Sequence, residues 1–301
     1  MKGFVRAVER FSLVVVVALA APAIMRGGPL RSSDDTRLKA AIRMIEEWKT
    51  PGLEAELSGI YPHPTDNNLY YVLANLKPPY RPGQKPMLPE QYRGKLLTVN
   101  KWTGEVVKAV HMADDDFGGL VMAEGHFYVA LTTSAKILKV DPNNLEVLAQ
   151  YALPSPPGGV AYDKDRGILL IHLYVGHPHL AVMEIKTGRI VETLYSDEST
   201  MGLVKVDGDW ICTWASSWDP GAFSEVHLID QKTGRVRSRI RVQGVHTCLA
   251  PDKDGKGGAA FACLVTVDSS TGKTVIRKYG YVGESRWEKV EPISQKTTAN
   301  N

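Results

Sequence analysis

The sequence predicts an all-β fold, a β-propeller with five blades of four antiparallel strands each. The clearest observation is a hairpin pattern at Val226–Ile240, where two alternating apolar runs flank a Lys-Thr-Gly turn. Similar segments recur at intervals of about 40–45 residues, which is typical of repeat architectures. They lie at Leu96–Val110, Ile137–Tyr151, Ala181–Tyr195 and Leu264–Tyr279. Two further strand-like runs precede each hairpin, and four strands per unit is the composition of a propeller blade.

Composition is consistent with a globular protein and argues against a nucleic-acid-binding surface. Of the 301 residues, 44% are hydrophobic and 23% are charged, and the net charge is only +3. The chain has no block of lysine and arginine and no motif of stacking aromatic residues. Three cysteines, Cys212, Cys248 and Cys263, are too few for a disulfide framework. Cys248 and Cys263 fall on adjacent predicted strands, so a cross-strand disulfide and two buried free thiols are both open, with the free thiols favoured.

The first 25 residues resemble an export signal. Lys2, Arg6 and Arg10 form a basic region, an apolar run follows at Phe11–Ala20, and small residues suited to cleavage come next. The apolar run is short for a membrane span, but an uncleaved anchor with its basic end in the cytoplasm is the alternative. We therefore expect an exported protein, periplasmic or extracellular, whose only membrane contact is made through residues 1–25.

Residues 33–50 carry the spacing of an amphipathic helix. Leu38, Ile42, Ile45 and Trp48 recur at helical intervals, and the Pro51-Gly52 pair ends the run. This helix would pack on the propeller or face a partner.

The propeller is predicted to span residues 53–292, because each of its five units starts with a small strand followed by an apolar one. The first strands begin at Ser58-Gly59-Ile60, Gly118-Gly119-Leu120, Gly158-Gly159-Val160, Met201-Gly202-Leu203 and His246-Thr247-Cys248. Glycine suits the innermost strand, because blades converge at the axis. We expect the residues before these glycines to face the channel, namely Ser58, Gly118, Gly158, Met201 and, in the fifth unit, His246. A sixth blade would need strands from the N-terminal segment, whose pattern is helical.

Two segments interrupt or follow the repeat. Residues 75–95 form a Pro-rich insertion with interspersed lysine and arginine, and so long an irregular loop is often functional. The alternative is a surface loop that Tyr80, Met87 and Tyr92 hold against the propeller. Residues 293–301 are a polar tail.

The run Leu69–Asn75 (LYYVLAN) and the turns at Lys101–Gly104, Lys186–Gly188 and Lys232–Gly234 resemble those of the YVTN-repeat and gluconolactonase/strictosidine-synthase-like secreted β-propellers. The opening Glu56–Ile60 is similar to the first blade of that group. This resemblance implies a lactonase or esterase-like activity with a divalent cation at the channel mouth. In the family an acidic residue early in blade one and Asn or Asp of later blades hold the cation, and Glu56 occupies the first of these places.

One face of the predicted propeller gathers carboxylates, histidines and aromatic residues. The loops before the first strands and those between second and third strands share that face, which collects Glu56, Asp114, Asp115, Asp116, His177, His179, Asp197, Glu198, Trp218, Asp219 and His246. Tyr80 of the insertion is a further binding candidate. Such a cluster could hold a metal or act as an acid–base pair, or it could be a solvated polar rim.

Two functions follow from these patterns. The first is an exported, non-catalytic binding module without a cofactor, an accessory subunit of an extracytoplasmic, membrane-attached protein complex. The second is a calcium- or zinc-dependent hydrolase of the lactonase type, with Glu56 as a metal ligand and His246 or Asp116 as the base. The small side chains expected in the channel favour the first.

Overall fold

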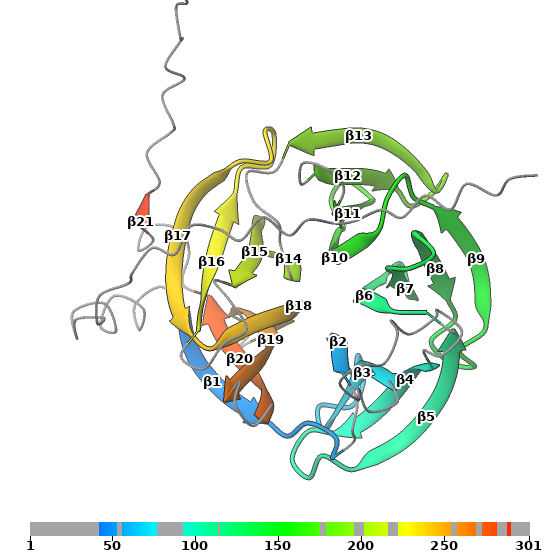
Figure 1. Ribbon diagram of the computed structural model, residues 1–301, viewed down its shortest axis with the longest axis vertical. Coiled ribbons are helices and arrows are strands. Elements are labelled where there is room, and N and C mark those ends of the chain that lie inside the picture. Colours follow the sequence, from blue (N-terminus) through cyan, green and yellow to red (C-terminus); the bar gives the residue numbers. More distant parts are fainter. Residues whose placement is uncertain are drawn as a thin grey trace, which may run out of the picture.

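The computed structural model describes residues 42–52, 56–76, 93–113, 115–174, 179–195, 202–215, 222–253, 258–268, 273–281 and 288–289. Within these residues the strands form five antiparallel sheets, arranged radially about a central axis (Figure 1). The predicted five-bladed, all-β propeller is therefore confirmed. Among the described residues no helix has the length and hydropathy needed to cross a bilayer.

In blades one to four the strands run from the axis to the rim in chain order. Blade one consists of β2 (Glu56–Pro62), β3 (Leu69–Leu76), β4 (Arg93–Asn100) and β5 (Val106–Ala113). Blade two consists of β6 (Phe117–Ala123), β7 (His126–Leu131), β8 (Lys136–Val140) and β9 (Val147–Ala152). Blade three consists of β10 (Pro157–Asp163), β11 (Ile168–Leu173), β12 (His179–Glu184) and β13 (Arg189–Tyr195). Blade four consists of β14 (Gly202–Val206), β15 (Asp209–Ala215), β16 (Phe223–Ile229), β17 (Val236–Gln243) and the short outer strand β21 (Glu288–Lys289).

Blade five joins the two ends of the chain. Its inner strands are β18 (Val245–Lys253), β19 (Ala259–Asp268) and β20 (Lys273–Tyr281), and its outer strand is β1 (Ile42–Trp48). The helix predicted over residues 33–50 is therefore wrong for residues 42–48, while residues 33–41 lie outside the described residues. The physical reason is that β20 offers β1 a row of backbone hydrogen-bond partners on both sides of a bulge at Met44/Glu46, whereas a helix this short is marginal without tertiary contacts.

The fifth predicted hairpin also has a different place from the one expected. The apolar run at Ala259 and the start of the hairpin at Leu264 form one ten-residue strand, β19. The turn after Asp268 therefore joins the second strand to the third, and β1 supplies the fourth. This arrangement removes the need for a sixth blade, because the N-terminal strand closes the fifth.

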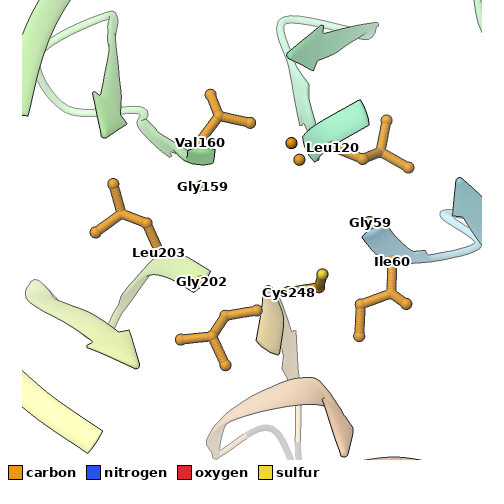
Figure 2. Close-up of a pocket in the computed structure, with 11 residues that line it drawn as sticks. Gly59, Ile60, Leu120, Gly159, Val160, Gly202, Leu203 and Cys248 are labelled. Atoms are coloured by element: carbon orange, nitrogen blue, oxygen red, sulfur yellow. The ribbon is translucent and has the colours of Figure 1, made fainter. Parts of the chain in front are cut away.

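Glycines allow the first strands to approach one another at the axis (Figure 2). A Cβ atom added to Gly159 would lie 2.9 Å from the backbone nitrogen of Leu203, and one added to Gly202 would lie 2.9 Å from that of Cys248. Distances under about 3 Å are not tolerated between such atoms without a shift of the backbone. In blade five Cys248 occupies the position of the glycine, with a left-handed backbone at φ 52°.

A bulge changes which residues face the axis. The register between first and second strand shifts between Leu57 and Gly59, and equivalent shifts occur in blades two, three and five. The extra residue in a bulge re-aims the side chains that follow it. The axis is lined by Gly59, Gly118, Gly119, Gly159, Gly202 and Cys248, and by the aliphatic residues Ile60, Leu120, Val160, Leu203 and Leu249. Of the predicted lining residues, Gly118 is thus confirmed; Ser58, Gly158 and His246 do not line the axis, and Met201 lies outside the described residues.

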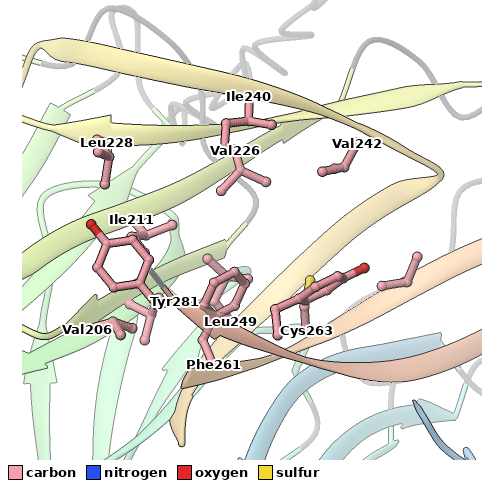
Figure 3. Close-up of a cluster of buried hydrophobic side chains, with 13 residues drawn as sticks. Val206, Ile211, Val226, Leu228, Ile240, Val242, Leu249, Phe261, Cys263 and Tyr281 are labelled. Atoms are coloured by element: carbon pink, nitrogen blue, oxygen red, sulfur yellow. The ribbon is translucent and has the colours of Figure 1, made fainter. Parts of the chain in front are cut away.

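Apolar side chains fill the space between neighbouring blades. Figure 3 shows one such cluster, in which Ile211 and Val226 of blade four meet Leu249 and Phe261 of blade five. All three cysteines are buried and free. Cys263 belongs to this cluster, whereas Cys248 packs in the cluster on the opposite side of blade five, against blade one. The two thiols therefore point away from each other, and the alternative of free thiols is the correct one.

The ring is closed by a clasp of aromatic and charged residues. Trp48 of β1 is 2% exposed and stacks on Tyr70 of blade one at 5.7 Å between ring centroids. The Lys101 Nζ lies 5.1 Å from the Trp48 ring and 4.6 Å from the Trp102 ring, and it donates to Glu46 Oε2 at 3.2 Å. The backbone nitrogen of Lys49 donates to the Lys101 oxygen at 2.8 Å. These contacts tie β1 to blade one as well as to blade five.

Substitution of Gly159 by alanine should destabilise the propeller by about 1–3 kcal/mol, the usual cost of overpacking. The added Cβ meets the Leu203 backbone, which cannot yield without opening the axis. The matched control is Gly52→Ala, since nothing lies within 4 Å of a Cβ at Gly52. Urea unfolding of both variants measures the difference; equal midpoints would contradict the proposed crowding.

Removal of the Trp48 side chain should cost about 3–5 kcal/mol in unfolding free energy, because a buried aromatic side chain leaves a cavity. Trp102→Ala serves as the control, because Trp102 is 49% exposed and its loss should cost less than about 1 kcal/mol. Thermal and urea unfolding of the two variants would test the clasp. A loss at Trp102 equal to that at Trp48 would argue against it.

Candidate functional site

The candidate site is the mouth of the axis on the face where first strands begin and second strands end. In blade one Glu56, the first residue of β2, lies opposite Asn75 near the end of β3. Asn75 is fully buried, and its amide nitrogen donates to Asp116 Oδ1 and lies 3.4 Å from Ser58 Oγ. Its oxygen accepts from the Phe117 nitrogen at 3.3 Å. Asn75 therefore joins blades one and two at the mouth.

Asp115 and Asp116 have different roles in this loop. The Asp115 carboxylate accepts from the backbone nitrogens of Asp116, Thr133 and Ser134 at 2.7–3.1 Å, so it holds the loop in shape. Asp115 is 5% exposed. The Asp116 carboxylate is instead turned towards Asn75 and is only partly buried. Of the two, Asp116 is the carboxylate that a ligand at the mouth would meet.

Tyr174 lies over the mouth from blade three. Its backbone nitrogen donates to the Pro156 oxygen at 3.0 Å, and its hydroxyl lies 2.6 Å from the position of a Cβ atom at Gly158. Burial, with the nearby Cys248 and Asp116, raises the pKa of the Tyr174 hydroxyl to about 12. The residue as a whole is still 45% exposed. Tyr174 therefore places a neutral hydroxyl close to the axis and one face of its ring towards solvent.

The axis below this mouth is closed to ligands. Its cavity has a volume of about 10 Å³, room for roughly one water molecule, and backbone and aliphatic groups line it. Burial raises the pKa of the Cys248 thiol to about 12, so the axis carries no thiolate at neutral pH. No group of three or more metal-ligating side chains occurs among the described residues. Glu56 and Asp116 are the carboxylates at the mouth, whereas calcium takes about six to eight oxygen ligands.

His246 is the second residue of β18, and its side chain is buried inside blade five. It is 1% exposed, its Nδ1 lies 3.2 Å from the Gly244 oxygen and its Nε2 lies 2.9 Å from the Tyr279 hydroxyl. Both ring nitrogens are thus engaged inside blade five. His179, the first residue of the third strand of blade three, packs edge-on against Tyr195 at 6.3 Å between ring centroids.

The structure thus brings Glu56, Asp115 and Asp116 together at the mouth. The other candidates lie outside the described residues, namely Tyr80, Asp114, His177, Asp197, Glu198, Trp218 and Asp219. Two residues of the mouth, Asn75 and Tyr174, were not singled out from the sequence as site residues. A signal for them exists, because both are polar residues at the end of an otherwise apolar second strand.

Comparison with known proteins supports the architecture. No protein-family model and no curated protein sequence matches the chain. The crystal structure of Myxococcus xanthus glutaminyl cyclase is similar with a TM-score of 0.56 at 14% identity, and the match covers 80% of this chain and 97% of that one. A Bacteroides caccae protein of unknown function gives a TM-score of 0.45 at 15% identity over 66% of this chain and 71% of that one. At 14% identity the likeness to the glutaminyl cyclase shows the fold and nothing of the activity.

Two buried histidines should make the protein acid-labile. Burial lowers the pKa of His246 and of His172 from 6.5 to about 4. The unfolded chain therefore binds protons below pH 6.5 that the folded protein does not, and stability falls as the pH drops towards 4. We expect the unfolding free energy to fall by about 2 kcal/mol per histidine between pH 7 and pH 5.

Urea unfolding at pH 7 and pH 5 measures this difference. His246→Gln should reduce the pH-dependent loss by about half, whatever its effect on stability at pH 7. The control is His126→Gln, since the His126 side chain is partly exposed and its Nδ1 lies 2.9 Å from the Glu124 oxygen. An unchanged pH dependence in His246→Gln would show that this histidine is not the source.

Proposed function

We propose that the protein is an exported, non-catalytic β-propeller that binds other proteins, as an accessory subunit of an extracytoplasmic, membrane-attached complex. The observation that carries this proposal is the closed axis. Enzymes bind small substrates in concave pockets with convergent polar groups. Here the first strands meet so closely that the axial cavity holds roughly one water molecule.

The outer surface supports the same function. In the part of the chain that the structure describes, five of the seven exposed large hydrophobic side chains lie on the rim strands β5, β9 and β13. They are Val107, Val147, Leu148, Val191 and Tyr195. Rim strands also present unpaired backbone groups, which favour association with other chains. The surface that remains for function is thus large, open and suited to a macromolecule.

The export and membrane attachment rest on the sequence. The basic and apolar runs of residues 1–25 are those of an export signal or an uncleaved anchor. The resemblance to secreted propellers with YVTN-type repeats agrees with an extracytoplasmic location. A propeller that is held at the membrane and has no axial pocket large enough for a substrate would then act through contacts with other proteins.

A cation-dependent hydrolase of the lactonase type is the second candidate. The observation in its favour is the pair of mouth carboxylates, Glu56 and Asp116, beside the Tyr174 hydroxyl. In this proposal Glu56 and Asp116 would hold a calcium or zinc ion, which would polarise a carbonyl group. His246 would not serve as the base, because both of its ring nitrogens are engaged in blade five.

Native mass spectrometry and activity assays together decide between the two functions. We expect the full chain, extracted gently from the membranes of its own organism, to migrate with partner proteins. We also expect no turnover of lactones, esters or glutaminyl substrates with calcium or zinc added. A free monomer in every fraction would overturn the binding function. Turnover lost in Asp116→Asn and kept in Glu105→Gln, an exposed acid remote from the mouth, would establish the hydrolase.

A further inference from the structure

Blade four carries two arginines that share one buried carboxylate. Glu225 of β16 lies directly opposite Arg241 of β17, and His227 lies opposite Arg239. The Arg241 Nε donates to Glu225 Oε1 at 2.9 Å, and Arg239 Nη1 lies 3.5 Å from Glu225 Oε2. The His227 Nε2 is 3.1 Å from the same Oε2. Two arginines of the neighbouring strand and one histidine of the same strand thus converge on a single acidic side chain.

Glu225 is fixed in the charged form. It is 3% exposed, and although burial raises the pKa of its carboxyl, hydrogen bonds from His227 and Arg241 and the charge of Arg239 lower it to about 2. Its two oxygens are occupied by these contacts. Glu225 therefore acts as an internal support that orients the arginines above it.

The arginine side chains are partly presented to solvent. The Arg241 side chain is 53% exposed and that of Arg239 is 42% exposed. The Arg241 guanidinium lies 4.7 Å from the centroid of the Phe223 ring, which holds its plane. Arg241 uses only Nε towards Glu225, so its two Nη groups point away from that contact and have no protein partner in the described part of the chain. A guanidinium with both Nη groups available is suited to bidentate binding of an oxyanion.

The charge balance indicates the class of ligand. Among the described residues, the Arg239 and Arg241 guanidinium groups share the single Glu225 carboxylate, so this group of three carries one excess positive charge. A carboxylate carries a single negative charge and matches this excess, whereas a dianionic phosphate would exceed it and lie close to Glu225. Phe223 adds an apolar surface beside the arginines, of the kind found in protein contacts.

We propose that Arg239 and Arg241, supported by Glu225 and Phe223, bind a carboxylate of an acidic segment of a partner protein. The strand order places this site on the same face as the axial mouth, because β16 begins after the loop between second and third strands and β17 ends near it. That the carboxylate belongs to a partner protein rests on the proposed function. That the site binds a carboxylate rests on its geometry alone.

The test uses the full chain labelled with ¹⁵N in its arginines, titrated with the peptide Ac-Glu-Gly-Glu-NH₂ and followed by NMR. The Nε–H signals of Arg239 and Arg241 should shift, and Ac-Gln-Gly-Gln-NH₂ should leave them in place. Arg241→Ala should abolish the response, and Arg241→Lys should weaken binding at least about fivefold, because lysine keeps the charge but loses the planar fork. Arg235 is exposed and immediately precedes β17, so Arg235→Ala removes the same charge at another place. This variant should bind the acidic peptide with an affinity within twofold of that of the natural protein.

Several outcomes would overturn the carboxylate site. These are no shift with the acidic peptide, an equal shift with the glutamine peptide, and a loss in Arg235→Ala as large as in Arg241→Ala. Tighter binding of inorganic phosphate at equal ionic strength would show that the site prefers phosphate. If Arg241→Ala unfolds, Arg241→Lys with an unchanged urea midpoint decides the matter. If the protein binds the peptide but is a monomer in its own membranes, the carboxylate site stands and the proposed complex is rejected.

Discussion

The contact between backbones at the axis is the constraint on which the rest of the structure depends. Each first strand lies against the next with no room for a side chain at its closest point, as at Gly159 against Leu203 and Gly202 against Cys248. Blades of four strands converge to this spacing only when glycine, or a left-handed residue such as Cys248, occupies the contact. The same contact that closes the ring also fills the place where other folds keep a ligand cavity. Polar side chains that could bind a ligand therefore lie at the mouth and at the rim, not at the axis.

Closure of the ring has a second requirement, because blade five combines an N-terminal strand with three strands from late in the sequence and must hold them together. Here β1 pairs with β20, and the clasp around Lys101 also fastens β1 to blade one. Lys101 is 8% exposed, so its charge is offset by Glu46 and by the faces of Trp48 and Trp102. The strand that completes blade five is thus also the strand that joins blade five to blade one.

The sequence was most informative where structure is local. The turn at Lys232–Gly234 predicted its hairpin because Gly234, with φ 74°, occupies a position that demands left-handed backbone. It was least informative where a distant segment decides the outcome. Residues 42–48 have helical spacing, yet the open edge of β20 makes them a strand. Asn75 belongs to blade one and Tyr174 follows the second strand of blade three, and no pattern within one blade encodes which blades meet at the mouth.

The charged side chains at the mouth and those on blade four are arranged differently. At the mouth the Asp115 carboxylate is used by backbone donors and Asp116 already faces Asn75, so each acid is engaged by the fold itself. On blade four the balance is reversed, because one carboxylate supports two guanidinium groups that retain unused donors. The pKa of the Glu225 carboxyl is lowered to about 2, so Glu225 stays charged at neutral pH and holds the two guanidinium groups in position. Permanently charged groups held in fixed positions recognise a partner of opposite charge, and this is the chemistry that the surface of the propeller offers.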